Sequence, residues 1–187
     1  MQPWEILEKF TGHLRDALAR SIAVATEVGS PVVSPVHLLY ALSLQKGSVA
    51  HEILTKVKIE SEGLQAHLIA TPNVARRSSA PVPTTTVPEL TKSAKQALEK
   101  AMLIASDYEH AHVGTEHLLI GLLHVKDKNI KGILDDAHVS PRRIEKHLET
   151  VLQSISRFPD LEDVDEMIGS ELEKPAEMER ALGPLEE

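Results

Sequence analysis

Hydrophobic positions along the chain recur three and four residues apart, which is the spacing of one face of an α-helix. One such stripe begins after Thr11 and another after Thr91, and threonine is a favoured helix N-cap. The two stripes consist of Leu14, Ala17, Leu18, Ile22, Ala25 and Val28, and of Ala94, Ala97, Leu98, Met102 and Ala105. No stretch alternates β-branched and polar residues as a half-buried strand would. The pattern therefore predicts an all-α protein.

Further helix starts and turns follow each of these two helices. Ser34 and Ser140 are N-cap residues that each precede a proline, which is tolerated at the first helical position because its missing N–H costs nothing there. Turns are predicted at Gly47 and at 126–128. The third helices hold Ile53-Leu54 and Ile133-Leu134, and the fourth helices end near Leu68 and 148–152. We therefore expect four helices in each half of the chain.

The two halves match each other at a constant offset, without a gap. The offset is eighty positions, as between Thr11 and Thr91. The other residues that are identical to the residue eighty positions later are Ala17, Leu18, Ala25, Val33, His37, Leu38, Leu39, Leu42, Lys46, Ile53, Leu54, His67 and Leu68. A four-helix unit of about 60 residues has a marginal core of its own. We expect the two copies to pack together as a pseudo-twofold eight-helix domain.

The predicted organisation has four parts. Residues 1–70 form repeat one, 71–89 a linker rich in Pro, Ser and Thr, 90–155 repeat two and 156–187 an acidic tail, helical or partly disordered. We expect Leu161, Val164, Ile168 and Leu172 of the tail to dock weakly on the folded part. Trp4, with Ile6 and Leu7, is expected to cover the core rather than to form a ligand platform.

The formal net charge of −8 is concentrated in the tail. Residues 156–187 hold 11 acidic and 3 basic residues, so 17 of each sign remain in 1–155. With only the pairs Arg76-Arg77 and Arg142-Arg143 to suggest a basic face, we expect no nucleic-acid partner. No apolar run is long enough to cross a bilayer, no signal segment opens the chain and cysteine is absent. We expect no membrane partner and a cytoplasmic protein.

Candidate chemistry along the chain is sparse. His37 and His117 occupy equivalent first-turn positions, where we expect each to hydrogen-bond a neighbouring backbone group. The histidines His110, His112, His117 and His124 have no zinc-site spacing, and the acidic residues Asp160, Glu162, Asp163, Asp165 and Glu166 lack the glycine and ligand spacing of a calcium loop. No phosphate-binding loop G-x-x-x-x-G-K-[ST] is present. We therefore predict no metal, no cofactor and no catalytic residue.

The segment GTEHLLIGL at 114–122, its counterpart SPVHLLYAL at 34–42 and the Phe10-Thr11 helix start resemble the Clp N-terminal repeat over residues 10–155. The resemblance is closest to N-domains of the ClpC type, or to stand-alone proteins such as the ClpT accessory proteins of plastids. It implies a compact helical module that receives substrates or adaptor proteins for a Clp-family AAA+ unfoldase and the ClpP protease. Any ATPase would then lie on a further part of the chain or on a partner.

The resemblance also implies recognition of phosphorylated arginine, by the acidic residue of the GTEH motif and a threonine that opens the first helix of a repeat. In repeat two these residues are Thr91 and Glu116. A carboxylate can hold a guanidinium group, while helix N-terminal N–H groups favour a phosphate. Repeat one keeps Thr11 but has Val36 in place of the acid, so we expect at most one site, in repeat two. Alternatively, Glu116 is a first-turn acid favoured by the helix dipole.

Three functional classes remain to be compared. The first is a protein-binding module of a Clp protease or chaperone system. The second is a stand-alone accessory or regulatory protein that decorates the Clp protease core, located in the plastid stroma if it is of the plastid type. The third, a small helical enzyme, would need a second catalytic group beside Glu116, but its neighbour His117 diverges from it by about 100° on a helix. We therefore expect a protein that is not an enzyme.

Overall fold

The computed structural model describes residues 3–70 and 87–157 of the 187-residue chain. The predicted linker lies outside the described residues except for 87–89, as does the acidic tail except for 156–157. The side chain of Trp4, the tail's apolar and acidic residues and the pair Arg76-Arg77 are also outside them.

The eight predicted helices are confirmed, and the two halves have the same order of elements. Repeat one contains α2 (Gly12–Glu27), α3 (Pro35–Leu44), α4 (Val49–Lys56) and α5 (Ser61–Ala70), and repeat two contains α6 (Lys92–Asp107), α7 (Thr115–His124), α8 (Lys128–Asp136) and α9 (Pro141–Arg157). A further short helix, α1 (Pro3–Glu8), precedes them. It was not predicted, because six residues are too few for a hydrophobic stripe to be recognised.

Matching residues begin and end the long helices. Thr11 caps α2 by accepting a hydrogen bond from the Leu14 N–H at 3.3 Å, and Thr91 caps α6 in the same way. After these helices, Gly29 and Glu109 occupy equivalent positions and both have a left-handed backbone, with φ of 68° and 58°. Since only glycine adopts this conformation without steric cost, the shared geometry at Glu109 shows that the repeat topology overrides local preference.

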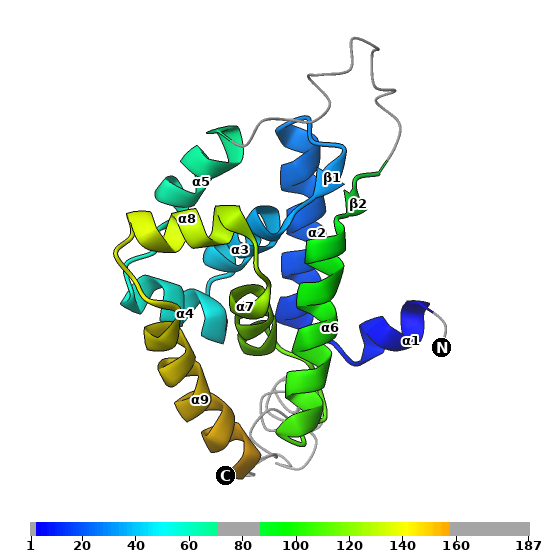
Figure 1. The fold of residues 1–187 in the computed structure, drawn as a ribbon. Coiled ribbons are helices and arrows are strands. Elements are labelled where there is room, and N and C mark those ends of the chain that lie inside the picture. The colour runs from blue at the N-terminus through cyan, green and yellow to red at the C-terminus, as the bar shows by residue number, and fades with distance from the viewer. Residues whose placement is uncertain (1–2, 71–86, 158–187) are drawn as a thin grey trace, which may run out of the picture.

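Helices α3 and α7 lie at the centre of the domain, with the other helices of both repeats around them (Figure 1). Eight of the ten residues of each central helix are buried. A helix that is hydrophobic on nearly all sides must be surrounded by other helices. The buried side chains of both repeats form one continuous core, which confirms the predicted packing of the two copies against each other.

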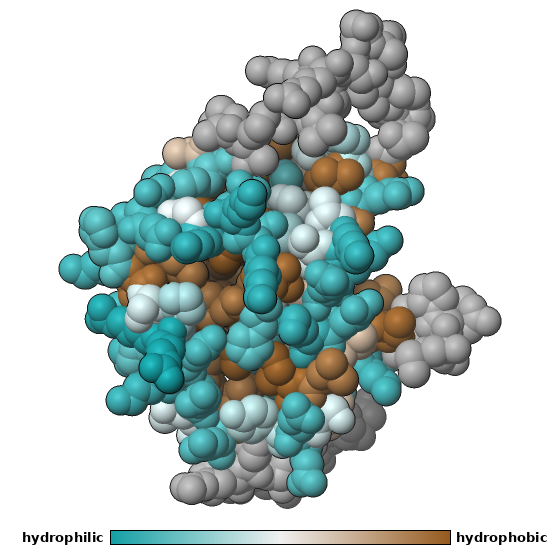
Figure 2. Space-filling view, viewed as in Figure 1, coloured by the Kyte–Doolittle hydropathy of each residue, from teal (hydrophilic) through white to brown (hydrophobic). Residues whose placement is uncertain are grey.

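The outer surface is mostly polar. Figure 2 shows hydrophilic side chains over most of the visible face, with hydrophobic side chains showing in the gaps between them. Among the described residues the large hydrophobic side chains that are exposed are Leu7, Val28, Val87 and Leu103. In the same part of the chain, no helix combines the length and the apolar composition that crossing a membrane requires.

The structure adds two very short strands to the predicted helical pattern. β1 (Val32–Val33) pairs in parallel with β2 (Glu89–Leu90), with Val33 opposite Leu90. An isolated bridge between Phe10 and Val113 repeats this pairing at the equivalent residues of the other copy. The residues before each helix are extended and their backbone groups have no helical partner, so adjacent segments from the two repeats pair with each other.

Gly121 allows α7 to approach α6 closely. A Cβ atom at Gly121 would overlap the backbone carbonyl oxygen of Ala97 and lie 3.2 Å from the Ala101 nitrogen. Repeat one has Ala41 at the equivalent position, and its α2–α3 contact is less extensive than the α6–α7 contact. The two repeats therefore share a topology but differ in how closely their first two helices pack.

We expect Gly121→Ala to lower the free energy of unfolding by about 1–3 kcal/mol, because the added methyl group meets backbone atoms that cannot turn aside. Gly132→Ala is the matched control, since a Cβ at this α8 position meets nothing within 4 Å. That change should raise the free energy of unfolding by about 0.5–1 kcal/mol through helix propensity. Urea denaturation of both variants checks the prediction, and equal effects would contradict the close approach.

Candidate functional site at the N-terminus of α7

The loop before α7 is held in place by the segment before α2. The N–H of Thr11 donates to the carbonyl of Val113 at 3.0 Å, and the N–H of Val113 donates to the carbonyl of Lys9 at 2.7 Å. Gly114 follows in an extended conformation as the N-cap of α7. The N-termini of α2 and α7 therefore lie next to each other, although they belong to different repeats.

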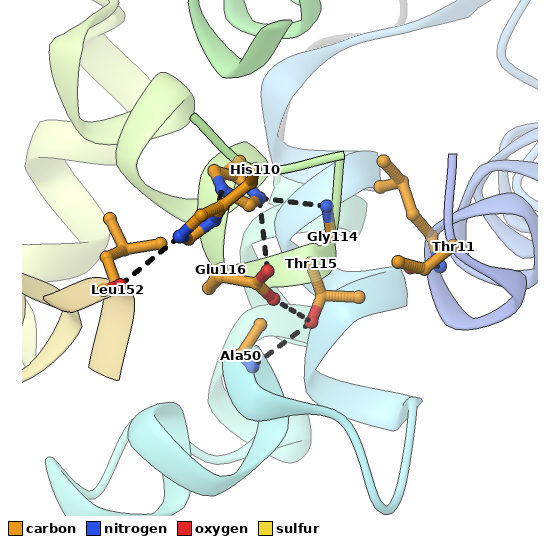
Figure 3. A network of polar contacts seen from close by, with 9 residues as sticks. Thr11, Ala50, His110, Gly114, Thr115, Glu116 and Leu152 are labelled. Carbon is orange, nitrogen blue, oxygen red and sulfur yellow. Dashed lines mark hydrogen bonds and ion pairs between the residues drawn. The ribbon is translucent and has the colours of Figure 1, made fainter. Parts of the chain in front are cut away.

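The threonines are exchanged between the repeats. The N–H of Thr91 donates to the carbonyl of Val33 at 2.9 Å, so Thr91 lies at the start of α3 in repeat one. Thr11 is the threonine beside the loop that precedes α7 and Glu116, as Figure 3 shows. The structure thus does not bring Thr91 and Glu116 together as the resemblance implied. The reason is the pseudo-twofold packing, which places the start of the first helix of each repeat against the loop that precedes the second helix of the other repeat.

Glu116 is buried, with 5% of its surface exposed, and its carboxylate folds back over Gly114. A Cβ atom at position 114 would overlap this carboxylate, so glycine is the residue that lets the glutamate adopt this position. In repeat one the equivalent residues are Ser34 and Val36. The position of the Glu116 carboxylate therefore depends on a glycine at 114, and repeat one has neither residue.

Glu116 also connects to the other repeat through Thr115. The Thr115 hydroxyl donates to Oε2 of Glu116 at 3.5 Å and accepts from the backbone N–H of Ala50 at 3.3 Å. Ala50 lies in the first turn of α4 in repeat one. The site is therefore built from both repeats, and Thr115 is one of the contacts between them (Figure 3).

Two histidines continue this network toward α9. The Gly114 N–H lies 2.8 Å from Nδ1 of His117, Nε2 of His117 lies 2.8 Å from Nδ1 of His110, and Nε2 of His110 lies 3.2 Å from the Leu152 carbonyl oxygen. The two rings meet edge to face, with centroids 4.9 Å apart. His110 directly follows Glu109, the left-handed residue just after α6, and its backbone N–H donates to the carbonyl of Ala105 at 2.9 Å.

The donors and acceptors of this hydrogen-bond network show which nitrogen of each histidine ring carries the proton. A backbone N–H can only donate, so Nδ1 of His117 accepts from Gly114 and the proton of a neutral His117 is on Nε2. His110 then accepts at Nδ1 and donates from Nε2 to Leu152. The prediction that His117 hydrogen-bonds a neighbouring backbone group is confirmed. A second proton on His117 would turn Nδ1 into a donor toward Oε1 of Glu116, 3.0 Å away.

Opposing effects act on the Glu116 carboxyl. Burial disfavours its charged form, but the contact with His117, the positive charge that His117 and His110 carry when they are protonated, and a bond from its own backbone N–H favour the carboxylate. These contacts outweigh burial and hold the pKa of Glu116 below its ordinary value. Glu116 is therefore an anion at neutral pH, located where the dipole of α7 also favours negative charge.

The equivalent histidine in repeat one has fewer partners. Nδ1 of His37 lies 3.1 Å from the Ser34 N–H and 2.8 Å from the Ser34 hydroxyl, which confirms the predicted bond to a backbone group. Among the described residues its Nε2 has no hydrogen-bond partner, because Ser30 stands where repeat two has His110. Burial lowers the pKa of His37 and keeps the ring neutral. The histidine network is thus complete only in repeat two.

The residues that sequence reasoning missed are the partners of the α7 N-terminus, namely His110, Ala50 and Leu152. His110 was considered as part of a histidine cluster, but nothing in its spacing indicated a contact with His117. His124 does not join this network: its Nε2 lies 3.3 Å from Oε1 of Glu145 on α9. Within residues 3–70 and 87–157, no three side chains of the metal-binding types converge on a common point.

Comparison with known proteins places this geometry in context. A family model described as the Clp repeat (R) N-terminal domain matches residues 9–88 and again 89–174. A probable ATP-dependent Clp protease ATP-binding subunit of Chlamydia pneumoniae is 27% identical over 154 residues, which are 81% of this chain but 17% of that protein. An uncharacterised protein of Mycobacterium bovis is 28% identical over 148 residues, and the match covers 79% of this chain and 55% of that protein.

Solved structures share the fold. The N-terminal domain of the chaperone ClpD from Arabidopsis thaliana superposes with a TM-score of 0.61 at 19% identity, covering 79% of this chain and 97% of that one. The N-domain of ClpV in complex with a VipB peptide superposes with a TM-score of 0.60 at 17% identity, covering 81% and 92%. The arrangement of the two repeats is therefore that of an established helical domain.

We expect Glu116→Gln to lower the free energy of unfolding at pH 7 by about 1–3 kcal/mol, because an amide replaces a buried, hydrogen-bonded carboxylate. A folded-state pKa below the unfolded value of 4.5 adds stability above pH 4.5, and this stability is lost as the pH falls through the folded pKa. The difference between the two proteins should therefore shrink in acid. Urea denaturation between pH 7 and pH 3 measures it.

Glu99→Gln provides the control for this experiment, because Glu99 is exposed on α6 and the same charge is removed. It should change the free energy of unfolding by less than about 0.5 kcal/mol at either pH. A Glu116→Gln variant that keeps the full pH dependence of the wild type would show that the carboxylate is not stabilised as described.

Proposed function

Because this chain belongs to the Clp repeat (R) N-terminal domain family, we propose that it is a protein-binding module that receives substrates or adaptor proteins for a Clp-type AAA+ unfoldase. The observation that carries the proposal is that the family match spans both repeats and all the helices from α2 to α9. The sequence contains no phosphate-binding loop, so ATP hydrolysis would come from another domain or from a partner.

The structural neighbours support a binding role. The ClpV N-domain, which has the same fold, is described in complex with a peptide of VipB. In this domain the hydrophobic residues of both repeats form one buried core, and the hydrogen-bond network around Glu116 holds side chains within the domain. The proposed activity therefore lies in recognition by the domain surface rather than in covalent chemistry.

One observation favours a second candidate, an accessory or regulatory protein that stabilises or decorates the Clp protease core. The match covers 17% of the Chlamydia pneumoniae ATP-binding subunit but 55% of the Mycobacterium bovis protein. The same pair of repeats thus forms a small fraction of a large ATPase and more than half of a shorter relative.

Affinity purification of the tagged chain from extract of its native cells, followed by mass spectrometry, tests the proposed function. We expect a Clp-family ATPase to be recovered as the main partner. Recovery of ClpP without any ATPase would favour the accessory protein instead. If neither is enriched over a purification with the tag alone, the proposal fails.

We further propose that repeat two binds phosphoarginine at the N-terminus of α7. The N-termini of α2 and α7 lie next to each other there, and their dipoles favour a phosphate. Glu116 supplies a carboxylate for the guanidinium group, once it turns away from Gly114 and exposes the first-turn N–H groups of α7. Thr11 lies beside this site, while the resemblance had implied Thr91.

Calorimetric titration with free phosphoarginine tests this second proposal and the choice of threonine. We expect saturable binding that is lost in Glu116→Ala and weakened in Thr11→Val, because these changes remove the carboxylate and the adjacent hydroxyl. Thr91→Val should bind as the wild type does. Binding that survives Glu116→Ala, or that depends on Thr91 instead of Thr11, would contradict the site.

A further inference from the structure

A groove runs along the outer face of repeat one, between α2 and α3. It has a volume of about 520 Å³, within the range of about 300–1,000 Å³ that is usual for ligand sites. We call it the α2–α3 groove. Its lining residues are Asp16, Ala19, Arg20, Ala23, Val24, Glu27, Tyr40, Leu44 and Gln45.

Small residues create the groove, and repeat two does not have them. Ala19 and Ala23 lie on the exposed side of α2, whereas the equivalent positions of α6 hold Glu99 and the exposed Leu103. The less extensive contact between α2 and α3, where Ala41 replaces Gly121, adds to the space. The small residues that line the groove are therefore specific to repeat one and are not required by the shared fold.

Among the polar side chains along the groove, Gln45 is hydrogen-bonded within the domain, with its Nε2 3.1 Å from Nδ1 of His13, whereas the charged residues of α2 are not. Asp16, Arg20 and Glu27 follow one face of α2 at helical spacing, with Ala23 between the last two. In the described part of the chain, no hydrogen bond or ion pair engages these three side chains or the Tyr40 hydroxyl. An apolar floor of Val24 and Leu44 thus lies beside an acid–base–acid row that is free to meet a partner.

We propose that the α2–α3 groove binds an amphipathic helix of a partner protein. The helix would lay small apolar side chains on Ala19, Ala23 and Leu44 and present a basic, an acidic and a basic residue to Asp16, Arg20 and Glu27. Recognition of an amphipathic helix in a groove between helices is a common mode of protein binding, and charge complementarity sets its register. The excess of acid in the row selects a basic partner face.

The spacing of the row sets the length of this helix. Asp16 and Glu27 are separated by about 16 Å along α2, and Arg20 lies about 6 Å from Asp16. A partner helix that reaches both acids therefore needs at least about 12 residues. Its two basic residues would be eleven positions apart. Its acidic residue, which faces Arg20, would be four positions from the basic residue that faces Asp16.

The groove lies on the exposed face of α2, whereas Glu116 is buried at the start of α7, so the two are separate sites. The inference rests on the proposed function only in taking a protein as the partner. The two proposals can therefore fail independently. Glu116→Ala should abolish phosphoarginine binding and leave helix binding unchanged.

The test uses two synthetic peptides of about 16 residues, one for each orientation, with the basic–acidic–basic pattern on an alanine and leucine face. A third peptide has the opposite pattern, with an acidic, a basic and an acidic residue at the same positions. NMR titration of the full chain should show shifts confined to α2, α3 and Gln45 for one of the first two peptides. The swapped peptide should bind at least about tenfold more weakly, because it places like charges together.

Two variants test the groove itself. Ala23→Leu fills it with the residue that repeat two has at this exposed position, and Asp16→Lys with Glu27→Lys reverses the row. Each should weaken the peptide at least about tenfold. Asp107→Lys, the same kind of change at the counterpart of Glu27 on α6, should leave binding within about twofold.

Three outcomes would overturn the inference. The first is no binding of any peptide at millimolar concentration. The second is equal binding of the charge-swapped peptide. The third is a set of shifts outside the groove that Ala23→Leu does not reduce. Denaturation curves of Ala23→Leu separate a loss of binding from a loss of folding, because the added side chain is exposed and should leave the free energy of unfolding nearly unchanged.

Discussion

The burial of two apolar helices, α3 and α7, is the constraint on which the rest of the structure depends. Each has eight buried residues out of ten, and a four-helix unit of about 60 residues has only a marginal core with which to bury such a helix. Packing the repeats together removes both helices from water and yields one continuous core. The pseudo-twofold arrangement and the short paired strands before the helices follow from this requirement.

The same packing builds the polar site from both repeats. Thr11 of repeat one lies beside the loop that precedes α7 and Glu116, and the hydroxyl of Thr115 reaches the first turn of α4 across the boundary between the repeats. Because Glu116 is buried and hydrogen-bonded, its charge stabilises the domain and would become available to a ligand only after the side chain turns outward. Stability and the proposed recognition therefore draw on the same carboxylate.

The two repeats share a topology but differ at the starts of α3 and α7, where the helices α6 and α7 meet, and on the outer face of α2. Repeat two keeps Gly114, Glu116 and the His110–His117 pair, and its α6 closely approaches α7 at Gly121. Repeat one has Val36 and a His37 ring with an unpaired Nε2, together with the α2–α3 groove. The two copies can differ at buried positions and keep one topology because a core tolerates substitutions that preserve its total volume and its apolar pattern.

The sequence by itself determined the helices, their caps and the repeat, because local spacing of apolar residues, N-cap threonines and serine–proline starts act within a few residues of each other. It also indicated the structural role of His37 and His117. Only the tertiary structure decided that Thr11, and not Thr91, lies beside the loop that precedes Glu116, and that His110 meets His117. These contacts depend on how two similar units pack across a pseudo-twofold axis, and no local pattern along the chain encodes that exchange.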